Sequence, residues 1–402
     1  MAADLARRGL LVRDVVLVGA GHAHVDVLRS FARERPANVQ LTLITRMDKT
    51  PYSGMLPGLI AGHYQPDDMQ IDIGPLARLS GTRVVLTEAV GLDASVGQVL
   101  CRNGLRIRYD VVSFDIGSTP NTQGVPGAGA HAIPVKPIDG FLARFDDACG
   151  RISERRNGSR IVVVGGGAAG VELMLAIHHR FQTMFSRDRF ETLNFSIITG
   201  SAKILPAFPR RFRARLRAIL AGRGIGIVEG ARVTSVSSNG IGVEGSPAIP
   251  ADEVFWTTEA TAPGWLRETG LALDGRGFIE VEATLRARDQ QAVFAAGDVA
   301  AFMPRALPKS GVFAVRQGPV LDRNLRRLLA GESLIDFRPQ SEALYLLATG
   351  ARHAVGTRNG LVFEGNWVWR FKNWLDTRFM SKYKLAAGPS ASACVNAPSD
   401  AG

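Results

Sequence analysis

Residues 160–170 read RIVVVGGGAAG, and this stretch decides the fold. The apolar residues before the glycines are typical of a buried parallel strand, and Gly165, Gly167 and Gly170 have the full spacing of a dinucleotide-binding turn. A helical pattern and a further strand, at residues 195–199, follow in the required order. Backbone N–H groups of such a turn approach a pyrophosphate, and the helix N-terminus adds partial positive charge. The stretch therefore predicts a dinucleotide site, with an ordinary tight strand-to-helix turn as the alternative.

The same order of elements occurs earlier in the chain. An apolar strand at residues 14–18 runs into Gly19 and Gly21, and a helical pattern at residues 22–33 and a buried strand at residues 39–45 follow. This second copy indicates an internal duplication of a nucleotide-binding plan. We therefore predict an α/β fold with two Rossmann-like dinucleotide-binding domains and a small C-terminal region.

The earlier turn is the less regular of the two. His24 stands where a third glycine would let helix and strand pack closely, and we interpret it as a packing residue. His22 lies at the mouth of the turn, where its ring could either meet a phosphate or cap the helix. The sequence leaves that choice open.

Neither of the second strands ends in the acidic residue that often holds a ribose diol. The strand ends are Thr45-Arg46 in the first unit and Thr199-Gly200 in the second. We assign Thr45 and Arg46 to the first cofactor site, where a hydroxyl could replace the carboxylate more weakly. In the second unit the missing acid removes one barrier to a 2′-phosphate, so NADH and NADPH both remain open.

Composition sets the broad class. The chain has 402 residues, 46% of them hydrophobic and 21% charged, which suits two or three globular domains. The formal net charge of +11 raises the affinity for any polyanion, whether nucleic acid, membrane or nucleotide. The arginine-rich residues 209–223 fall where the second unit needs a helix, so we do not predict nucleic-acid binding.

Cysteine usage and hydropathy bear on location. The three cysteines, Cys101, Cys149 and Cys394, are dispersed and form no CxxC pair or metal-ligand cluster, as is typical of a reducing cytosol. The N-terminus lacks the pattern of a signal peptide, and no run of about 18 apolar residues occurs. We expect a cytoplasmic protein without a metal site, with attachment to the inner face of a membrane left open.

Seven ordered motifs make the sequence recognisable as a whole. They are GAGHAH, TPYSGMLPGLIAGHY, FDIGSTPN, PVKPID, GGGAAGVE, VFAAGDVA and LPKSGVFAVRQG. Over residues 14–384 the chain resembles the FAD-dependent pyridine nucleotide-disulfide oxidoreductase superfamily. Within it, the chain is similar to type II NADH dehydrogenases and to the flavoprotein domain that is fused N-terminally to selenophosphate synthase.

The resemblance implies that FAD contacts a pyrophosphate turn, a second fingerprint, a crossover segment, a loop beside the isoalloxazine and a hinge lysine. The pyrophosphate turn is Gly19, Gly21 and His22, and the second fingerprint is Gly297 and Asp298. The crossover segment is Ser118, Thr119 and Pro120. The loop beside the isoalloxazine is the stretch from Pro51 to Pro57, and the hinge lysine is Lys136. The resemblance also implies a discontinuous FAD domain at residues 10–134 and 277–342. Residues 135–276 would then be the NAD(P) domain, 343–384 a C-terminal hairpin and aromatic helix, and 385–402 a disordered tail.

The resemblance places the nicotinamide dinucleotide at Gly165, Gly167 and Gly170, with Glu172 near the nicotinamide end as a catalytic candidate. One departure weakens that site. Residues 256–259, WTTE, stand where relatives carry an ATG-like turn, and Glu259 brings a carboxylate to a position that is usually glycine.

Two further catalytic candidates come from LPKSGVFAVRQG, which borders the acceptor site in quinone-reducing relatives. Lys309 could stabilise negative charge on reduced flavin or on a quinone oxygen, with a solvated surface lysine as the alternative. Gln317 could border the acceptor or cap the start of a helix. The sequence does not choose between these roles.

The resemblance implies an FAD-dependent NAD(P)H dehydrogenase that passes electrons to a quinone-like or other small acceptor. No redox-active cysteine pair exists, so the electrons cannot leave through an internal disulfide, and sulfide oxidation through such a pair is disfavoured. Two alternatives remain. One is a selenium- or sulfur-compound oxidoreductase, and the other is a flavin-binding redox sensor with a decayed nicotinamide site. The oligomeric state is not predicted.

Residues 365–384, GNWVWRFKNWLDTRFMSKYK, hold three of the five tryptophans. In a helix, one face would collect apolar residues together with flanking and intervening cations. The apolar residues are Trp367, Val368, Phe371, Trp374 and Leu375, the flanking cations Arg370 and Lys372, and the intervening ones Arg378 and Lys382, with Trp369 and Met380 pointing away. Such a helix suits the surface of an anionic membrane, and the alternatives are packing on the FAD domain or against a second subunit.

Overall fold

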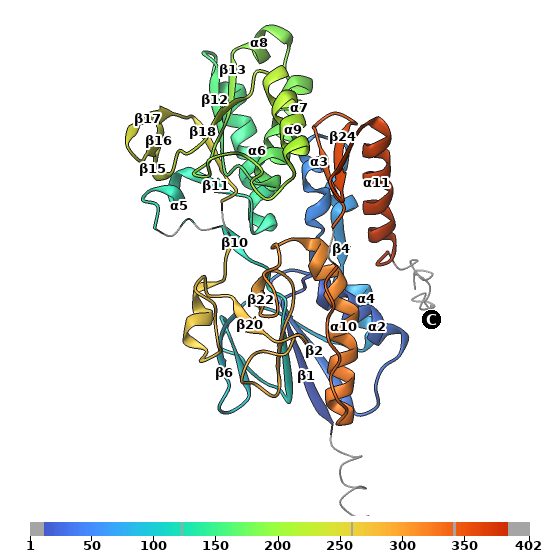
Figure 1. Cartoon of the computed structure of the whole chain (residues 1–402). Helices are drawn as coiled ribbons and strands as arrows, with labels where there is room; N and C mark the ends of the chain where they lie inside the picture. Colours follow the sequence, from blue (N-terminus) through green and yellow to red (C-terminus); the bar gives the residue numbers. More distant parts are fainter. Residues whose placement is uncertain (1–11, 121, 123, 259, 341–342, 385–402) are drawn as a thin grey trace, which may run out of the picture.

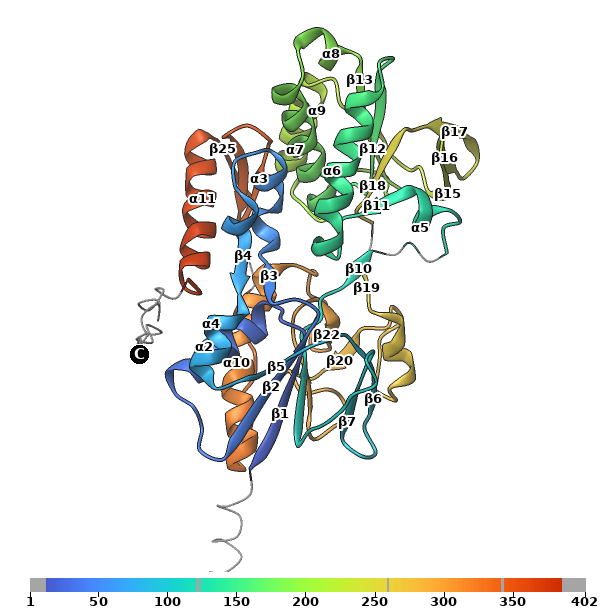
Figure 2. The same ribbon diagram turned by 180° about the vertical axis from the view of Figure 1, so that it is seen from behind.

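The computed structural model describes residues 12–120, 122, 124–258, 260–340 and 343–384. The chain forms two lobes, one above the other in Figure 1, and each is built around a five-stranded parallel sheet. A smaller C-terminal region of three strands and a helix lies along one side (Figures 1 and 2). This architecture confirms the predicted α/β class with two Rossmann-like units and a small C-terminal region.

The sheet of the first lobe has the strand order β21-β9-β1-β2-β5. These strands are β1 (Arg13–Val18), β2 (Val39–Thr45), β5 (Arg83–Leu86), β9 (Val111–Phe114) and β21 (Val293–Ala295). Helix α2 (His22–Arg33) contacts both α4 (Ile73–Ser80) and α10 (Gly311–Ala330). Smaller elements complete the lobe: β6 (Ala89–Asp93), β7 (Gln98–Cys101), β8 (Arg106–Arg108), β20 (Ile279–Val281), η4 (Gly297–Val299) and β22 (Ala300–Phe302). The last four residues of β1 are buried, because a parallel sheet needs apolar side chains on both faces.

The sheet of the second lobe has the order β11-β18-β12-β13-β14. These strands are β11 (Ala132–Pro134), β12 (Ser159–Val164), β13 (Leu193–Ile198), β14 (Gly226–Val228) and β18 (Glu253–Trp256). The helices are α5 (Ala128–His131), α6 (Ile138–Glu154), α7 (Ala168–Met184), α8 (Arg187–Glu191) and α9 (Arg210–Gly222), and an antiparallel sheet is made by β15 (Val233–Ser237), β16 (Gly240–Val243) and β17 (Ser246–Pro250). The strand–turn–helix–strand order read from residues 160–170 is thus present as β12, α7 and β13.

The chain passes between the lobes at two short paired strands. β10 (Thr119–Pro120) runs antiparallel to β19 (Ala260–Thr261). β11 already belongs to the second sheet, whereas η3 (Gly264–Glu268) contacts β6 of the first lobe. The sequence placed the domain boundaries after residues 134 and 276. We propose instead that they lie at β10 and β19, because strand pairing and packing assign the segments beyond them to the opposite lobes.

Residues 51–57, which the resemblance indicated as a loop, are largely regular structure. After β3 (Lys49–Pro51), which pairs with β4 (Gln70–Asp72), the turn η1 (Ser53–Met55) leads into α3 (Leu56–Ile60). A proline is tolerated in the first turn of α3, where the N–H groups have no helical partner. Both terminal residues of α3 are buried, and the helix contacts α7 of the other lobe. The prediction of a loop was wrong because this packing outweighed local propensity.

The C-terminal region is an antiparallel sheet of β23 (Tyr345–Ala348), β24 (Ala354–Arg358) and β25 (Leu361–Gly365), with α11 (Asn366–Ser381) packed on it. Trp367, Phe371 and Trp374 on α11 are exposed by 58%, 38% and 50%. Val368, which we predicted on the same face, is fully buried, because α11 turns that side towards the sheet. Within the described residues, no helix is both long and apolar enough to cross a bilayer.

Lys372 also departs from the prediction that it flanks an exposed face. Its ammonium donates hydrogen bonds to the carbonyl of Gly54 and to the carboxylate of Asp376, both at 2.8 Å. Tyr52 donates to the same carboxylate at 3.1 Å. These contacts dock α11 onto the segment around η1, so the helix packs on the first lobe through its inner face.

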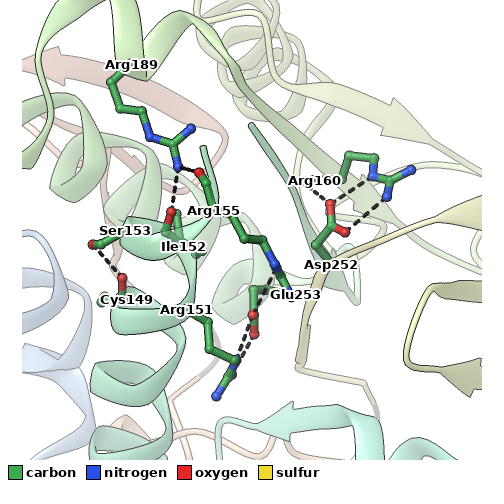
Figure 3. A network of polar contacts seen from close by, with 9 residues as sticks. All are labelled: Cys149, Arg151, Ile152, Ser153, Arg155, Arg160, Arg189, Asp252 and Glu253. Carbon is green, nitrogen blue, oxygen red and sulfur yellow. Dashed lines mark hydrogen bonds and ion pairs between the residues drawn. The ribbon is translucent and has the colours of Figure 1, made fainter. Parts of the chain in front are cut away.

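A buried carboxylate ties α6 to β18, an interior strand of the second sheet (Figure 3). Glu253 begins β18, and its side chain is only 4% exposed. Arg151 forms a bidentate pair with it, with N–O distances of 2.8 and 2.7 Å, and Arg155 adds a contact at 3.3 Å. Nearby, Arg160 makes a similar bidentate pair with Asp252, whose side chain is 21% exposed. The two pairs share a geometry and differ mainly in burial.

We expect Arg151→Met to lower the free energy of unfolding by about 2 kcal/mol, because the buried carboxylate of Glu253 would lose its bidentate partner. The matched change Arg160→Met removes the more exposed pair and should cost less than about 1 kcal/mol. Urea unfolding of both variants measures the difference. Equal losses would contradict the assignment of stability to the buried pair.

Candidate functional site

One cavity of the first lobe brings together most of the residues predicted to bind the first cofactor. It lies beyond the carboxyl ends of β1, β2 and β9, where open parallel sheets bind their ligands. The predicted residues that line it are Gly19, Gly21, His22, Thr45, Arg46, Pro51, Ser118, Thr119, Lys136 and Asp298. Pro120 and Gly297 are not part of this lining. Pro120 pairs with Ala260 in the link between the lobes, and a Cβ on Gly297 would lie 2.4 Å from a carboxylate oxygen of Asp115.

Asp115 is a central residue of this cavity that the sequence reasoning missed. It directly follows β9, and its carboxylate accepts hydrogen bonds from the backbone N–H groups of Ala23, at 2.8 Å, and His24, at 3.3 Å. The carboxylate therefore occupies the positive end of α2, the position at which Rossmann folds receive a phosphate. Burial raises the pKa of Asp115 to about 7.

The two histidines of the first turn have different environments. His24 is buried and bonds through its two ring nitrogens to the carbonyl of Gly19, at 2.6 Å, and to the hydroxyl of Ser113, at 2.8 Å. This agrees with its interpretation as a packing residue. His22 lines the cavity, and its ring meets Tyr52 edge-on with the ring centres 5.4 Å apart. Its buried Nε2 has no hydrogen-bond partner in the described part of the chain. Burial lowers the pKa of His22 to about 4, so the ring is neutral near pH 7.

Three distant motifs converge on one carboxylate. Lys136 Nζ lies 2.5 Å from Asp298 Oδ2, and the Ser118 hydroxyl donates to the same oxygen at 3.1 Å. Lys136 follows β11, Ser118 follows β9, and Asp298 lies in η4, so only the folded chain unites them. The sequence predicted these residues as a crossover, a hinge lysine and a second fingerprint, and the structure brings all three to the same wall of the cavity.

The two candidates from LPKSGVFAVRQG lie outside the cavity lining. Lys309 is not a solvated surface lysine: its ammonium donates to the carbonyl of Ala300 at 2.6 Å and lies 3.8 Å from the ring centre of Phe278. Burial lowers the pKa of Lys309 to about 8. Gln317 is 2% exposed, and its side-chain oxygen accepts the Gly297 N–H at 2.7 Å. Because α10 begins well before it, Gln317 positions the η4 turn and does not cap the helix start.

The cavity wall at the end of β2 contains Thr45, Arg46 and a carboxylate from another element. The Thr45 hydroxyl donates to the carbonyl of Met47 at 3.0 Å, so it is engaged by its own loop. Arg46 lies 3.4 Å from the carboxylate of Asp139, which is in the first turn of α6 and also lines the cavity. A carboxylate is thus present at this wall, and it comes from the second lobe.

The glycines of the second turn, between β12 and α7, have two different roles: two of them allow close packing of the helix, and one leaves space for a ligand. Gly165 has a φ of +125°, and a Cβ on Gly170 would lie 1.9 Å from the carbonyl oxygen of Gly165. These two glycines allow α7 to pack against the turn. A Cβ on Gly167 would have no described atom within 4 Å. Gly167 therefore faces the open space that the approach of a pyrophosphate requires.

Glu172 lies one turn further along α7, against the C-terminal region. Its carboxylate accepts the backbone N–H of Ala348 in β23 at 2.7 Å. Burial raises the pKa of Glu172 to about 7, an effect that the ammonium of Lys372 opposes. Its catalytic role remains a prediction. Glu259, which weakened the expected nicotinamide site, lies outside the described residues, as do Cys394 and the tail at 385–402.

Neither metal nor disulfide chemistry is evident in the described part of the chain. No group of three or more His, Cys, Asp or Glu residues there could hold a metal ion. Cys101 and Cys149 are both free, and neither lines the cavity.

Two Rossmann-type units, each with its own glycine turn, define a dinucleotide-dependent oxidoreductase. The chain belongs to the pyridine nucleotide-disulphide oxidoreductase family, whose model matches residues 13–318. It is 24% identical to an NADH dehydrogenase-like protein of Bacillus subtilis, over 93% of this chain and 99% of that protein. It is 23% identical to a type II NADH:quinone oxidoreductase of Staphylococcus epidermidis, over 93% of this chain and 96% of that protein.

Solved structures share the fold. The sulfide:quinone oxidoreductase of Aquifex aeolicus superposes with a TM-score of 0.79 and 16% identity, covering 92% of this chain and 91% of that one. The Plasmodium falciparum protein NDH2 in complex with NADH superposes with a TM-score of 0.77 and 14% identity, covering 92% and 98%. The resemblance to the oxidoreductase superfamily is confirmed, whereas nothing bears on the fusion to selenophosphate synthase.

FAD and a nicotinamide dinucleotide are the cofactors of this class, and the first cavity fits FAD. The buried Nε2 of His22 has no partner among the residues that the structure describes and lies at the cavity wall, where a polar cofactor atom could satisfy it. The ammonium of Lys136 supplies positive charge to the same wall. Asp115 also lines the cavity, and its carboxyl group binds the N-terminus of α2. A pyrophosphate at this turn therefore has to share that N-terminus with the carboxyl group of Asp115.

We expect FAD affinity to fall at alkaline pH because of Asp115. Its folded-state pKa of about 7 means that it ionises as the pH rises through 7, and the carboxylate then repels the pyrophosphate and competes for the Ala23 N–H. The affinity of the apoprotein should fall by up to about tenfold per pH unit above pH 7, the limit for one coupled proton. Fluorescence titration with FAD from about pH 6 to 9 measures this slope, which Asp115→Asn should flatten.

Asp139→Asn provides the matched control, because Asp139 lines the same cavity but pairs with Arg46. It should keep the wild-type slope. An unchanged slope in Asp115→Asn would show that another group carries the pH dependence.

Proposed function

We propose that the protein oxidises NAD(P)H and passes the electrons through FAD to a quinone. The observation that carries this proposal is the lining of the first cavity: none of its described residues is a cysteine, so this wall offers no disulfide to take electrons from the flavin. Relatives that match 93% of this chain are named as type II NADH:quinone oxidoreductases, which supports a quinone as acceptor.

When bound, FAD would supply the chemistry of accepting a hydride and releasing electrons singly or in pairs. The residues of this chain would hold and tune it. Lys136 and Ser118 fix the carboxylate of Asp298 at the cavity wall, and Gln317 fixes the backbone that presents it. His22 is neutral near pH 7 and can donate or accept a hydrogen bond at Nε2. No residue is required as a general base, because hydride transfer moves no separate proton at the donor.

Anaerobic titration of the purified protein with NADH and NADPH tests the first half of the proposal. Bleaching of the flavin band near ~450 nm, a property of the cofactor, would establish the dehydrogenase half-reaction. Turnover with a panel of quinones tests the second half. Selenite and selenodiglutathione serve as the competing acceptors, and turnover with them but with no quinone would overturn the choice of acceptor. Flavin that neither nucleotide bleaches would overturn the whole proposal.

We further propose that α11 meets a membrane surface, where a quinone would be found. The exposed rings of Trp367, Phe371 and Trp374 lie on the outer side of the helix, and the last two stack with their centres 6.1 Å apart. Arg378 lies 5.0 Å from the Trp374 ring, so a cation accompanies the aromatic patch. Aromatic and cationic side chains together favour the interface of anionic lipid.

The triple variant Trp367→Ser, Phe371→Ser, Trp374→Ser is expected to lose at least roughly tenfold in affinity for vesicles that contain anionic lipid. Sedimentation with phosphatidylglycerol-containing vesicles measures the binding. Leu79→Ser is the control, since Leu79 is 60% exposed on α4 and should not matter. Equal binding of the triple variant and the wild type would contradict this membrane contact.

A further inference from the structure

We infer that the second dinucleotide site prefers NADPH to NADH, and that Lys203 and Arg232 recognise the 2′-phosphate. This inference rests on the proposed function, because it names the donor that the nicotinamide site takes. The relevant position is the carboxyl end of β13. In NAD-dependent Rossmann folds the corresponding strand ends in the acid that binds the ribose.

The end of β13 offers no acid to the ribose. Thr199 follows the strand and is 5% exposed, and its hydroxyl accepts the backbone N–H of Ser201 at 3.2 Å. Gly200 comes next and has no side chain. A carboxylate here would bind a ribose diol and repel a 2′-phosphate, so its absence favours the phosphorylated cofactor.

The nearest acid on the neighbouring strand end is already occupied. Glu229 directly follows β14, and one of its carboxylate oxygens accepts the backbone N–H of Ile204 at 2.6 Å. The same oxygen accepts a hydrogen bond from the Arg217 guanidinium. Because the Arg217 guanidinium balances its charge and the Ile204 N–H binds the same oxygen, Glu229 holds the loop after β13 in place and adds little negative charge to the ribose end.

That loop is folded back onto the dinucleotide turn. The backbone N–H of Leu205 donates to the carbonyl of Gly166 at 2.6 Å, and the N–H of Gly230 donates to the carbonyl of Ser201 at 2.9 Å. Residues 201–203 between these anchors are exposed. The loop therefore presents its side chains beside the turn that would receive the pyrophosphate.

Two exposed cations lie at this place. Lys203 is in the loop itself, and Arg232 follows β14, with its Cα 3.6 Å from where a Cβ on Gly200 would be. Across the residues that the structure describes, neither cation has a carboxylate within 4 Å. Other arginines of this region are engaged, since Arg217 pairs with Glu229 and Arg223 bonds to the carbonyl of Thr349. A 2′-phosphate would give both cations a partner, whereas the ribose hydroxyl of NADH would not.

Calorimetry on the FAD-loaded protein tests the inference without relying on turnover. The two probes are adenosine 2′,5′-bisphosphate and AMP, which differ only in the 2′-phosphate. We expect the bisphosphate to bind at least about tenfold more tightly, as two charge-assisted contacts allow. The double variant Lys203→Ala, Arg232→Ala should remove this difference and leave AMP binding unchanged. The ratio of kcat/KM for NADPH to that for NADH should fall by the same factor.

Arg156→Ala is the matched control, because Arg156 is an exposed cation that precedes β12, at the amino ends of the strands of the same sheet, whereas the proposed site lies at their carboxyl ends. It should keep the tenfold difference. Equal binding of the two probes by the wild type would overturn the NADPH preference and leave the proposed function standing. Binding of neither probe would overturn both, since the second dinucleotide site would then be absent.

Discussion

Gly21→Ala is expected to yield protein that no longer retains FAD. The backbone of Gly21 is extended, so conformation alone would permit alanine, but an added Cβ would lie 2.2–2.4 Å from the carboxylate atoms of Asp115. Two N–H groups of α2 hold that carboxylate. Either the carboxylate or the start of α2 must therefore move, and both belong to the pyrophosphate end of the cavity. We expect the dissociation constant for FAD to rise by a factor on the order of 100, equivalent to about 2.7 kcal/mol.

The absorbance ratio of the purified protein and titration of the apoprotein with FAD measure this effect. Gly140→Ala is the control, since a Cβ at Gly140 in α6 meets nothing within 4 Å. The double variant Gly21→Ala, Asp115→Ala removes the clash and should regain FAD, which separates a local clash from general misfolding. Stoichiometric FAD in the single variant would contradict the place assigned to this turn.

Gly167→Val should have the opposite profile, with FAD and stability retained but reduction by NAD(P)H lost. Gly167 caps the start of α7 with a φ of −76° and a ψ of −179°, a conformation that valine readily adopts. The new side chain would extend into space that is open in the protein alone, so folding should be unaffected. It would block the close approach of a pyrophosphate to the backbone. The rate of flavin reduction at low nucleotide concentration should fall by a factor on the order of 100, about 2.7 kcal/mol.

Stopped-flow reduction of the flavin by each nucleotide measures this loss, with FAD content and thermal unfolding as checks. Gly150→Val in α6 is the control, because it also adds a side chain where no atom lies within 4 Å. Wild-type reduction kinetics in Gly167→Val would mean that the second glycine turn is not a cofactor site.

The tertiary structure supplied what sequence reasoning missed about the first cavity. Asp115 was visible in the motif FDIGSTPN as an acidic residue just after an apolar strand, but nothing local said that it would meet the start of α2. That contact depends on β9 lying beside β1. Leu17 of β1 pairs with Ser113 of β9, and Asp115 follows Ser113 by two residues. Pairing between strands about 95 residues apart cannot be read from periodicity.

The roles of Gln317 and Lys372 were likewise decided by packing. Gln317 belongs to a motif that suggested an acceptor site, yet its side chain is buried against the backbone of Gly297. Lys372 has the helical spacing of an interfacial cation, yet α11 rotates it towards Gly54 and Asp376. A helical pattern defines which residues share a face, but it does not define which face the rest of the protein covers.

The sequence by itself determined the two glycine turns and the order of strands and helices around them, because these depend on local periodicity and on glycine geometry, and its seven ordered motifs carried the resemblance to the family. It also showed that the three cysteines are dispersed and form no CxxC motif. Only the tertiary structure decided that Lys136, Ser118 and Asp298 share one wall, that Asp115 occupies the start of α2, and that Glu229 pairs with Arg217 beside two cations that have no carboxylate partner among the described residues. Charges that interact across a fold depend on distances of a few ångströms between segments far apart in the chain, and those distances exist only once the sheets have formed.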